Sequence, residues 1–287
     1  MSELIVIGTG ISSISHITME AKIAIQTAEK LLYLVGEPLT KQWLEETNPT
    51  AEDLHPFYAD GKDRRQTYQE MCDHIVKFVR DGVSVCAAFY GHPGIFCAPP
   101  HMAIQQLRSE GYRAKMLPGV CAEDCLFADL GVDPARSGCQ SFETTDFLLY
   151  ERRFDPSCSL VLWQVGVIGH TDFQSTGYKD KGTGFLADYL LRFYPPTHKV
   201  TIYEAATYFL CEPRIETVPL SSLPNSKVSS ISTLYVPPHG IRSANIETLR
   251  SLQISEHVMT KLYLTGDAVL SDARFLHDDS RLLGQTT

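Results

Sequence analysis

The sequence predicts an α/β fold of two lobes with a cleft between them. In the first 118 residues short apolar stretches alternate with helical patterns, as they do in a mostly parallel sheet covered by helices on both faces. Between residues 119 and 238 several strand-like stretches surround one long helix, which predicts a second α/β lobe. Residues 239–287 have a polar helical pattern, and we expect them to form a C-terminal tail.

Each element of the first lobe follows from its own pattern. Short apolar runs predict strands at residues 3–8, 30–35, 83–91 and 112–119. Apolar residues spaced by three and four predict helices at residues 18–30, 40–47, 63–81 and about 100–110. Pro118 and Gly119 then interrupt the pattern, and we expect the boundary with the second lobe there.

The second lobe is expected to open with a helix near residues 122–130. Strand-rich stretches follow at residues 139–150, 159–169, 198–206, 214–223 and 229–238. The long helix is expected near residues 183–193.

The composition and charge of the chain exclude several classes of protein. Asp and Glu number 34 against 25 Lys and Arg, so the net charge is -9, which disfavours tight binding to nucleic acid. No apolar run has the length of a membrane helix, and we expect no membrane partner. The eight cysteines are scattered without a paired CxxC framework, which predicts reduced thiols, a cytoplasmic location and no metal site.

The turn "IGTGISS" after the first strand has two interpretations. A Gly-x-Gly turn allows backbone to approach a dinucleotide phosphate, but Ser13 stands where that motif has its third glycine. The acidic residue that follows the second strand, Glu37, lies beyond a further glycine. We therefore favour the alternative, a tight turn at the mouth of the cleft.

A second turn, "FYGHPGIF", is a stronger sign of a ligand site. Gly91 and Gly94 permit backbone close to a ligand, and Pro93 fixes the turn. The turn also follows the carboxyl end of a strand, where open α/β sheets bind ligands. We expect "LPGVCAEDCLFADLG" (117–131) and "LWQVG" (162–166) to reach the same cleft. A lone histidine in a turn is usually a capping or packed residue, so the interpretation depends on the three segments together.

The helix predicted at residues 63–81 carries Arg64 and Tyr68 four positions apart, and therefore on the same face. Arg65 is an alternative to Arg64, although it lies less squarely over Tyr68. The residues that continue this face inward are Cys72, Ile75 and Val79. The simpler interpretation is an amphipathic helix with an arginine at its rim.

Three stretches, "YGHPGIFCAPPHMAI", "LPGVCAEDCLFADLG" and "STLYVPP", resemble the tetrapyrrole-methylase-type S-adenosylmethionine methyltransferases. The resemblance covers residues 3 to about 238 and implies a two-lobed fold that binds S-adenosylmethionine, or its product S-adenosylhomocysteine, between the lobes. "HPFYADGKDRRQTYQEM" resembles more particularly the borosin peptide α-N-methyltransferases, which carry Tyr, Arg and Tyr before the GHPG turn. The first loop, "GTGISSISHIT", departs from the glycine-proline-glycine-aspartate loop of tetrapyrrole enzymes, which speaks against a porphyrinoid substrate.

This resemblance implies methylation of backbone amides in a ribosomally made precursor peptide. An amide nitrogen becomes nucleophilic when it loses its proton, which requires a base and a partner for the charge on the oxygen. Tyr68 is the expected base, because the guanidinium of Arg64 would favour its phenolate form. Tyr58 and Tyr90 are expected to donate hydrogen bonds to the amide oxygen.

The resemblance also assigns residues to the cofactor. They are Tyr90, His92, Ile95, Cys121, Ala122, Gln164, Tyr203, Ser232 and Thr233. Cys121 stands where family members often have serine. We interpret Cys121 and Cys125 as packed thiols, because methyl transfer of this kind needs no covalent intermediate.

The resemblance further implies a homodimer that binds a precursor protein through a folded leader, giving a heterotetramer with two precursors. Because "RLLGQTT" at the end of the sequence contains no apolar core peptide, we expect the precursor to be supplied in trans. "IETLRSLQI" and "VMTKLYL" in the tail space apolar residues at three and four, and they are candidate docking or dimer-bracing segments. The alternative is that the tail packs on its own lobe.

Three other functions compete with this one. A C-methyltransferase acting on a tetrapyrrole or corrinoid is disfavoured by the altered first loop and by the Tyr/Arg/Tyr helix. A ribosomal RNA methyltransferase is disfavoured by the acidic charge. A catalytically silent peptide-binding partner would retain the cofactor only as structure, and mass spectrometry of the chain and its co-expressed neighbours would distinguish it.

Overall fold

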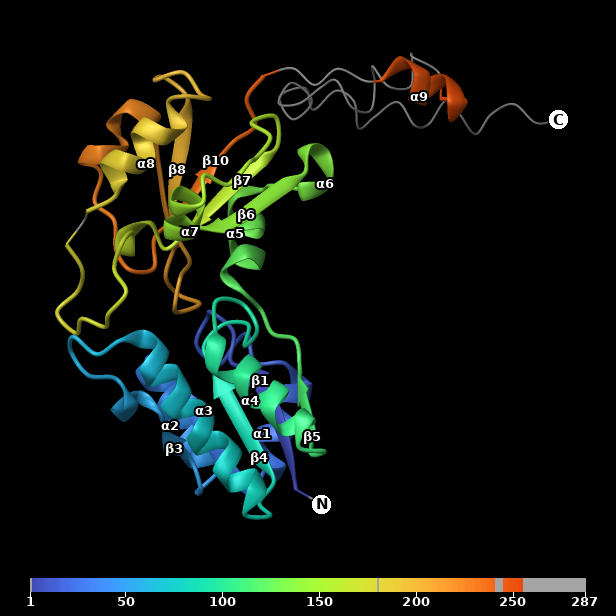
Figure 1. Cartoon of the computed structure of the whole chain (residues 1–287), viewed down its shortest axis with the longest axis vertical. Coiled ribbons are helices and arrows are strands. Elements are labelled where there is room, and N and C mark those ends of the chain that lie inside the picture. The colour runs from blue at the N-terminus through green and yellow to red at the C-terminus, as the bar shows by residue number, and fades with distance from the viewer. Residues whose placement is uncertain (1, 180, 241–244, 255–287) are drawn as a thin grey trace.

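The computed structural model describes residues 2–179, 181–240 and 245–254, arranged as two lobes one above the other (Figure 1). The N-terminal lobe contains β1 (Glu3–Gly8), α1 (Met19–Thr27), β2 (Lys30–Leu34), α2 (Pro38–Thr47), β3 (Glu52–Asp53), η1 (His55–Phe57), α3 (Arg64–Arg80), β4 (Val85–Phe89), α4 (Ala98–Ser109) and β5 (Arg113–Met116). The C-terminal lobe contains α5 (Ala122–Leu130), α6 (Pro134–Ser137), β6 (Cys139–Glu143), α7 (Thr144–Leu149), β7 (Ser159–Trp163), η2 (Val165–Val167), α8 (Thr183–Leu190), β8 (Lys199–Glu204), β9 (Arg214–Pro219), η3 (Leu220–Asn225) and β10 (Thr233–Val236).

The sheet of the N-terminal lobe has the strand order β3-β2-β4-β1-β5, and every neighbouring pair is parallel. Helices α3 and α4 cover one face, while α1 and α2 cover the other. The predicted parallel sheet with helices on both faces is therefore confirmed. Because parallel strands end at the same edge, the turns after these strands gather beside the second lobe, toward which the β4 arrow points in Figure 1.

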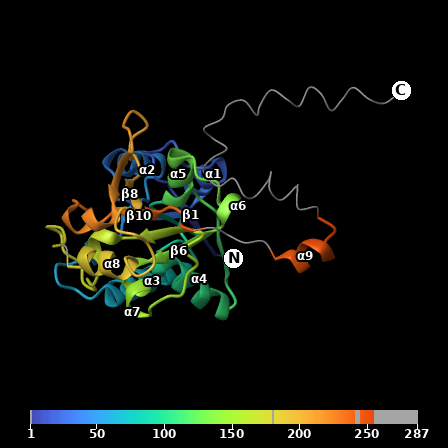
Figure 2. The ribbon, with the colours of Figure 1, turned by 90° about the horizontal axis from the view of Figure 1, so that it is seen from above.

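The sheet of the C-terminal lobe has the order β6-β7-β10-β8-β9. Only β6 and β7 pair in parallel; β10 pairs antiparallel with β7 and β8, and β8 pairs antiparallel with β9. Figure 2 shows α5 on one side of these strands and α7 and α8 on the other, and the buried clusters agree with this arrangement. Each lobe thus has its own core.

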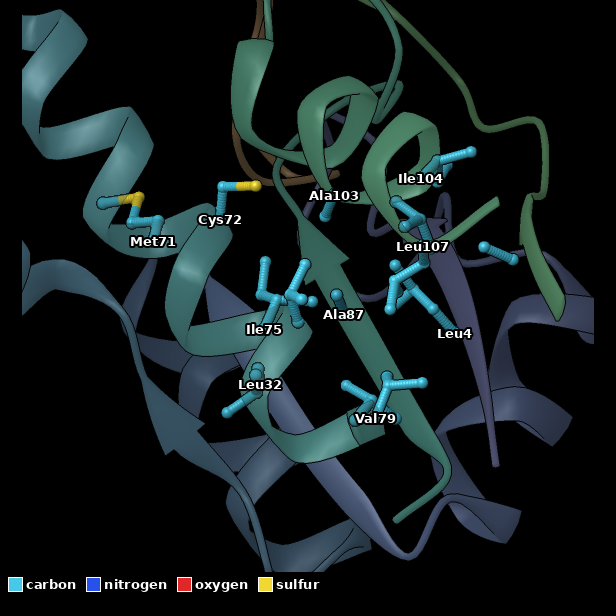
Figure 3. Packing of buried hydrophobic residues seen from close by; sticks show 14 of the residues in the cluster. Leu4, Leu32, Met71, Cys72, Ile75, Val79, Ala87, Ala103, Ile104 and Leu107 are labelled. Atoms are coloured by element: carbon cyan, nitrogen blue, oxygen red, sulfur yellow. The ribbon is translucent and has the colours of Figure 1, made fainter. Parts of the chain in front are cut away.

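The core beneath α3 fixes the direction of that helix. Cys72, Ile75 and Val79 are buried against the sheet and α4, as Figure 3 shows, so the predicted inward face is confirmed. Burying an aliphatic side chain of this size stabilises a fold by roughly 1.5–3 kcal/mol. The carboxylate of Asp63 caps the helix by accepting from the backbone N of Arg65 at 2.7 Å, which makes Arg64 its first residue.

Several stretches differ from the sequence prediction. The strands predicted at residues 159–169 and 214–223 end earlier, with β7 and β9, and η2 and η3 follow them. The long helix predicted near residues 183–193 is the shorter α8. Residues 139–150 form a strand only as far as Glu143, whose side chain then caps α7 by accepting from the backbone N of Asp146 at 2.7 Å. In the predicted tail, α9 (Ile246–Ser251) is a short helix. The segment "VMTKLYL" (258–264) and the remainder of that prediction lie outside the described residues.

None of the eight cysteines, all of which the structure describes, forms a disulfide. Among the residues that the structure describes, no helix combines the length and the apolar character needed to cross a membrane.

Candidate active site

A pocket of about 960 Å³ lies between the two lobes and is lined by residues of both. Its wall in the N-terminal lobe includes the start of α3 and the turn after β4, and its wall in the C-terminal lobe includes the start of α5 and the turn after β7. This volume is at the upper end of the range for small-molecule sites, which is large enough for two ligands to meet.

Three glycines bring the turns of the N-terminal sheet together at this pocket. A Cβ on Gly8 would stand 2.2 Å from the carbonyl oxygen of Gly91, and a Cβ on Gly119 would stand 3.2 Å from the same atom. The backbones of Gly10 and Gly91 exchange hydrogen bonds of 3.2 and 3.0 Å. Because the "IGTG" backbone pairs with the GHPG turn, the interpretation of that stretch as a tight turn at the cleft is favoured over a phosphate loop.

The GHPG turn holds itself in shape through its own polar atoms. The backbone N of Gly94 donates to His92 Nδ1 at 3.0 Å, and the backbone N of Ile95 donates to the carbonyl of His92 at 3.2 Å. Phe96 follows with a φ of 51°, a left-handed conformation that is uncommon for a side chain of this size. Ile95 is 40% exposed and lines the pocket with His92 and Phe96.

The four residues with predicted catalytic roles all reach the pocket. Tyr58, Arg64, Tyr68 and Tyr90 are part of its wall. Arg64 and Tyr68 come from the first two turns of α3, Tyr58 follows η1, and Tyr90 follows β4. Arg65 is exposed and does not line the pocket, so the geometry favours Arg64 over this alternative.

Burial opposes the ionisation of these phenols. Desolvation raises the pKa of Tyr68, although the positive charge of Arg64 and a hydrogen bond from Tyr58 act in the opposite direction. Desolvation likewise raises the pKa of Tyr58 and of Tyr90. The effect of Arg64 thus has the expected sign, while burial raises the pKa of Tyr68 by more, because a phenolate loses its hydration in the pocket.

Seven of the nine residues assigned to the cofactor line the pocket, and two do not. The seven are Tyr90, His92, Ile95, Cys121, Ala122, Gln164 and Thr233. Tyr203 is buried, and its Oη donates to Asp129 Oδ2 at 2.6 Å. Ser232 is also buried, and its hydroxyl donates a hydrogen bond to the carboxylate of Glu204. The positions of Tyr203 and Ser232 therefore favour supporting roles behind the wall.

Gln164, like Phe96, has a backbone in the left-handed region, with a φ of 61°. A non-glycine residue held there is strained, and such strain gathers at functional sites. Cys121 shows no sign of a nucleophile. Burial raises the pKa of its thiol to about 11, and its backbone N donates to Asp124 Oδ2 at 2.7 Å at the start of α5.

Sequence reasoning missed an aromatic part of the wall. The rings of Phe96 and Trp163, one from each lobe, are 5.8 Å apart, and those of Tyr58 and Phe173 are 4.8 Å apart. Trp163 could have been found from its position beside Gln164 in "LWQVG". Phe173 and Tyr178 lie in a polar stretch without periodicity, "TDFQSTGYKD", which carries no such signal.

Glu37 lines the pocket but is fully engaged as a helix cap. Desolvation would raise the pKa of its carboxyl, but hydrogen bonds from the hydroxyls of Ser13 and Thr40 and from the amides of Leu39 and Thr40 lower it to about 2. The carboxylate accepts from Ser13 Oγ at 2.6 Å, so it joins the first turn to α2. Glu37 is thus not available as a base.

Residues 3–224 match the family model of the tetrapyrrole (corrin/porphyrin) methylases. The chain belongs to this family. Solved structures of similar fold include the uroporphyrin-III C-methyltransferase of Thermus thermophilus, with a TM-score of 0.59 and 16% identity over 93% of this chain and 99% of that one. A diphthine synthase, with a TM-score of 0.59 and 12% identity, covers 91% of this chain and 100% of its own. The predicted two-lobed tetrapyrrole-methylase fold is therefore confirmed.

Proteins of much higher sequence identity to this chain have names that join a methyltransferase to a cyclic-peptide precursor. The chain is 41% identical over 255 residues to a methyltransferase/ribosomally synthesized cyclic peptide precursor for gymnopeptides from Gymnopus fusipes. It is 40% identical to the omphalotin A precursor of Omphalotus olearius; each alignment covers 88% of this chain and 61% of the relative. A type I borosin precursor of Coprinopsis marcescibilis is 42% identical, with coverages of 88% and 67%. The borosin resemblance is thus confirmed, and the chain spans about three fifths of the length of the first two relatives.

Proposed function

We propose that this chain is an S-adenosylmethionine-dependent methyltransferase that α-N-methylates backbone amides of a ribosomally synthesised precursor peptide. The observation that carries the proposal is the convergence of Tyr58, Arg64, Tyr68 and Tyr90 on one pocket between the lobes. The borosin relatives, whose names join a methyltransferase to a cyclic-peptide precursor, support the same reaction.

The residues of this wall match what amide methylation requires. The amide nitrogen must lose its proton while negative charge collects on the amide oxygen. Tyr68 is our proposed base, and Arg64 is the fixed positive charge that favours its ionised form. Tyr58 and Tyr90 are protonated phenols, and they are proposed to donate hydrogen bonds to the amide oxygen.

Other lining residues are proposed to bind a nucleoside-sized cofactor. The left-handed Gly91 allows the GHPG backbone to border the pocket, and the strained Gln164 faces the same space from the other lobe. His92, Ile95, Cys121, Ala122 and Thr233 complete the proposed binding surface. S-adenosylmethionine, when bound there, supplies a methyl group activated by its sulfonium. A structure of the Thermus thermophilus relative in fold is complexed with S-adenosylhomocysteine, which supports this choice.

We also propose that the precursor is a separate protein, recognised through a folded leader. A homodimer of the enzyme is proposed to bind it, so that two enzyme chains hold two precursors. The names of the relatives support a precursor peptide as the substrate. Supply in trans and dimerisation remain predictions from the family resemblance. A cytoplasmic location is also part of the proposal, and cysteines without disulfides are compatible with it.

The test is methylation with S-adenosylmethionine of the chain itself and of a separate precursor peptide. Mass spectrometry is expected to record mass increments of whole CH2 units on the precursor peptide, and sizing is expected to record a complex with it. If the enzyme elutes at the same volume with and without the precursor, and the precursor is not methylated, the hypothesis of supply in trans is rejected. Absence of methylation on both proteins, together with turnover of a porphyrinogen, would favour the tetrapyrrole alternative.

A further inference from the structure

We propose that Tyr178 is a positioning residue that holds the guanidinium of Arg64 in place at the pocket wall, from the opposite lobe. The inference deepens the proposed function, on which it rests for its kinetic consequence. Arg64 Nη2 donates to Tyr178 Oη at 3.0 Å, and the guanidinium carbon lies 5.6 Å from the centroid of the Tyr178 ring. A hydrogen bond and a cation–π contact thus act together on one side chain.

Tyr178 is itself fixed by its own segment. Its Oη donates to the carbonyl of Asp172 at 3.3 Å and accepts from the backbone N of Gln174 at 3.3 Å. The ring of His170 packs edge-on against it, with centroids 5.0 Å apart. The hydroxyl that receives Arg64 is therefore oriented before any ligand binds.

The segment that carries Tyr178 is tied to the N-terminal lobe beside α3. The backbone N of Gly61 donates to the carbonyl of Phe173 at 3.0 Å. Asp60 accepts from the backbone N of Ser175 at 2.6 Å and from its hydroxyl at 2.8 Å. Arg64 and Tyr68 are in α3 of the N-terminal lobe, whereas Tyr178 lies between η2 and α8 of the C-terminal lobe. The position of the guanidinium therefore depends on this contact between the lobes.

The side chain of Tyr178 is chemically suited to hold Arg64. A carboxylate beside Arg64 would neutralise its charge, whereas a hydroxyl and an aromatic ring orient the guanidinium and leave its charge directed at the pocket. Arg64 lowers the pKa of Tyr68 through that charge. Loss of Tyr178 is therefore expected to weaken methyl transfer through Arg64, without a contact of its own to the reacting atoms.

The kinetic test uses Tyr178→Phe, which keeps the ring, and Tyr178→Leu, which removes both contacts. We expect kcat on a precursor peptide to fall by about 2- to 10-fold for Tyr178→Phe and about 10- to 100-fold for Tyr178→Leu. The KM for peptide and the Kd for S-adenosylmethionine should stay within about threefold, because the contact is to Arg64 rather than to either ligand. Tyr150, an exposed tyrosine whose ring also packs on an arginine, Arg152 at 5.2 Å, supplies the matched control Tyr150→Leu.

A double-mutant cycle tests whether the effect passes through Arg64. In an Arg64→Ala background, Tyr178→Leu should change kcat by less than about twofold, because both contacts that it would break are already lost. An equal loss of kcat in both backgrounds would overturn the proposal, as would a Tyr178→Leu enzyme with unchanged kcat.

A readout independent of methylation separates this inference from the proposed function. In protein with 15N-labelled arginine, the side-chain signal of Arg64 can be assigned by its loss in Arg64→Lys. Its guanidinium protons should exchange with water at least about threefold faster in Tyr178→Leu than in wild type. If exchange is faster in Tyr178→Leu but the wild-type enzyme methylates no peptide, the positioning role is retained and the proposed reaction is rejected. Unchanged exchange would remove the positioning role whatever the activity.

Discussion

The carbonyl oxygen of Gly91 lies so close to Gly8 that a Cβ on Gly8 would stand 2.2 Å from it. The end of the first strand and the GHPG turn are therefore in direct backbone contact, and the pocket wall is built on that contact. A side chain at residue 8 would have to push the turn aside, because backbone atoms cannot give way as a flexible side chain can.

Gly8→Ala is expected to destabilise the protein by roughly 1–3 kcal/mol, the usual cost of overpacking. Urea unfolding measures this as a lower midpoint with an unchanged slope. Gly184→Ala is the matched control, since nothing lies near its Cβ and Gly184 is in α8; it should be neutral or stabilising by up to about 1 kcal/mol. Equal midpoints for the two variants would contradict the contact.

Tyr68→Phe and Arg64→Ala are expected to lower the rate of methyl transfer by about 10²- to 10⁴-fold, the usual contribution of a general base. The affinity for S-adenosylmethionine should change by only a few-fold, because both side chains are assigned to the amide. Single-turnover assays and calorimetry measure the two quantities. Arg65→Ala, at an exposed neighbouring position outside the pocket, is the control and should retain activity. Near-wild-type turnover by Tyr68→Phe would show that the proton leaves by another route.

The variant Gln164→Gly distinguishes the backbone strain at residue 164 from the contribution of its side chain to cofactor binding. Glycine adopts a positive φ at no steric cost, so the variant should be as stable as wild type or more stable by up to about 1 kcal/mol. Its affinity for S-adenosylmethionine should nevertheless fall about tenfold, because we assign to the Gln164 side chain a hydrogen bond to the cofactor. Thermal unfolding and calorimetry measure both. Unchanged affinity would remove Gln164 from the cofactor site.

We expect the free energy of unfolding to decrease in acid because of Glu37. Its folded-state pKa of about 2 lies below the ordinary value of 4.5, so its contribution is fully present above about pH 4.5 and is lost as the pH falls toward 2. Unfolding free energies measured from pH 7 to pH 2 should decline less steeply in Glu37→Gln, which should also be less stable at pH 7. Parallel pH curves for the two proteins would contradict this role.

The sequence was sufficient to predict the architecture, and the four residues with proposed catalytic roles reach one pocket as expected, because local patterns determine both. Arg64 and Tyr68 are four apart on one helix, and the GHPG turn ends an apolar strand. Tyr178 lies in a stretch without periodicity and meets Arg64 only through contact between the lobes. The ionisation of Tyr68 was also beyond a local pattern, since it depends on burial by both lobes as well as on the neighbouring charge.

The most direct test of the central claim is the position of the methyl group on a treated precursor peptide. Tandem mass spectrometry after incubation with S-adenosylmethionine is predicted to locate each added CH2 on a backbone amide nitrogen, with wild-type enzyme and not with Tyr68→Phe. Methyl groups on side chains, or equal methylation by both enzymes, would contradict the account.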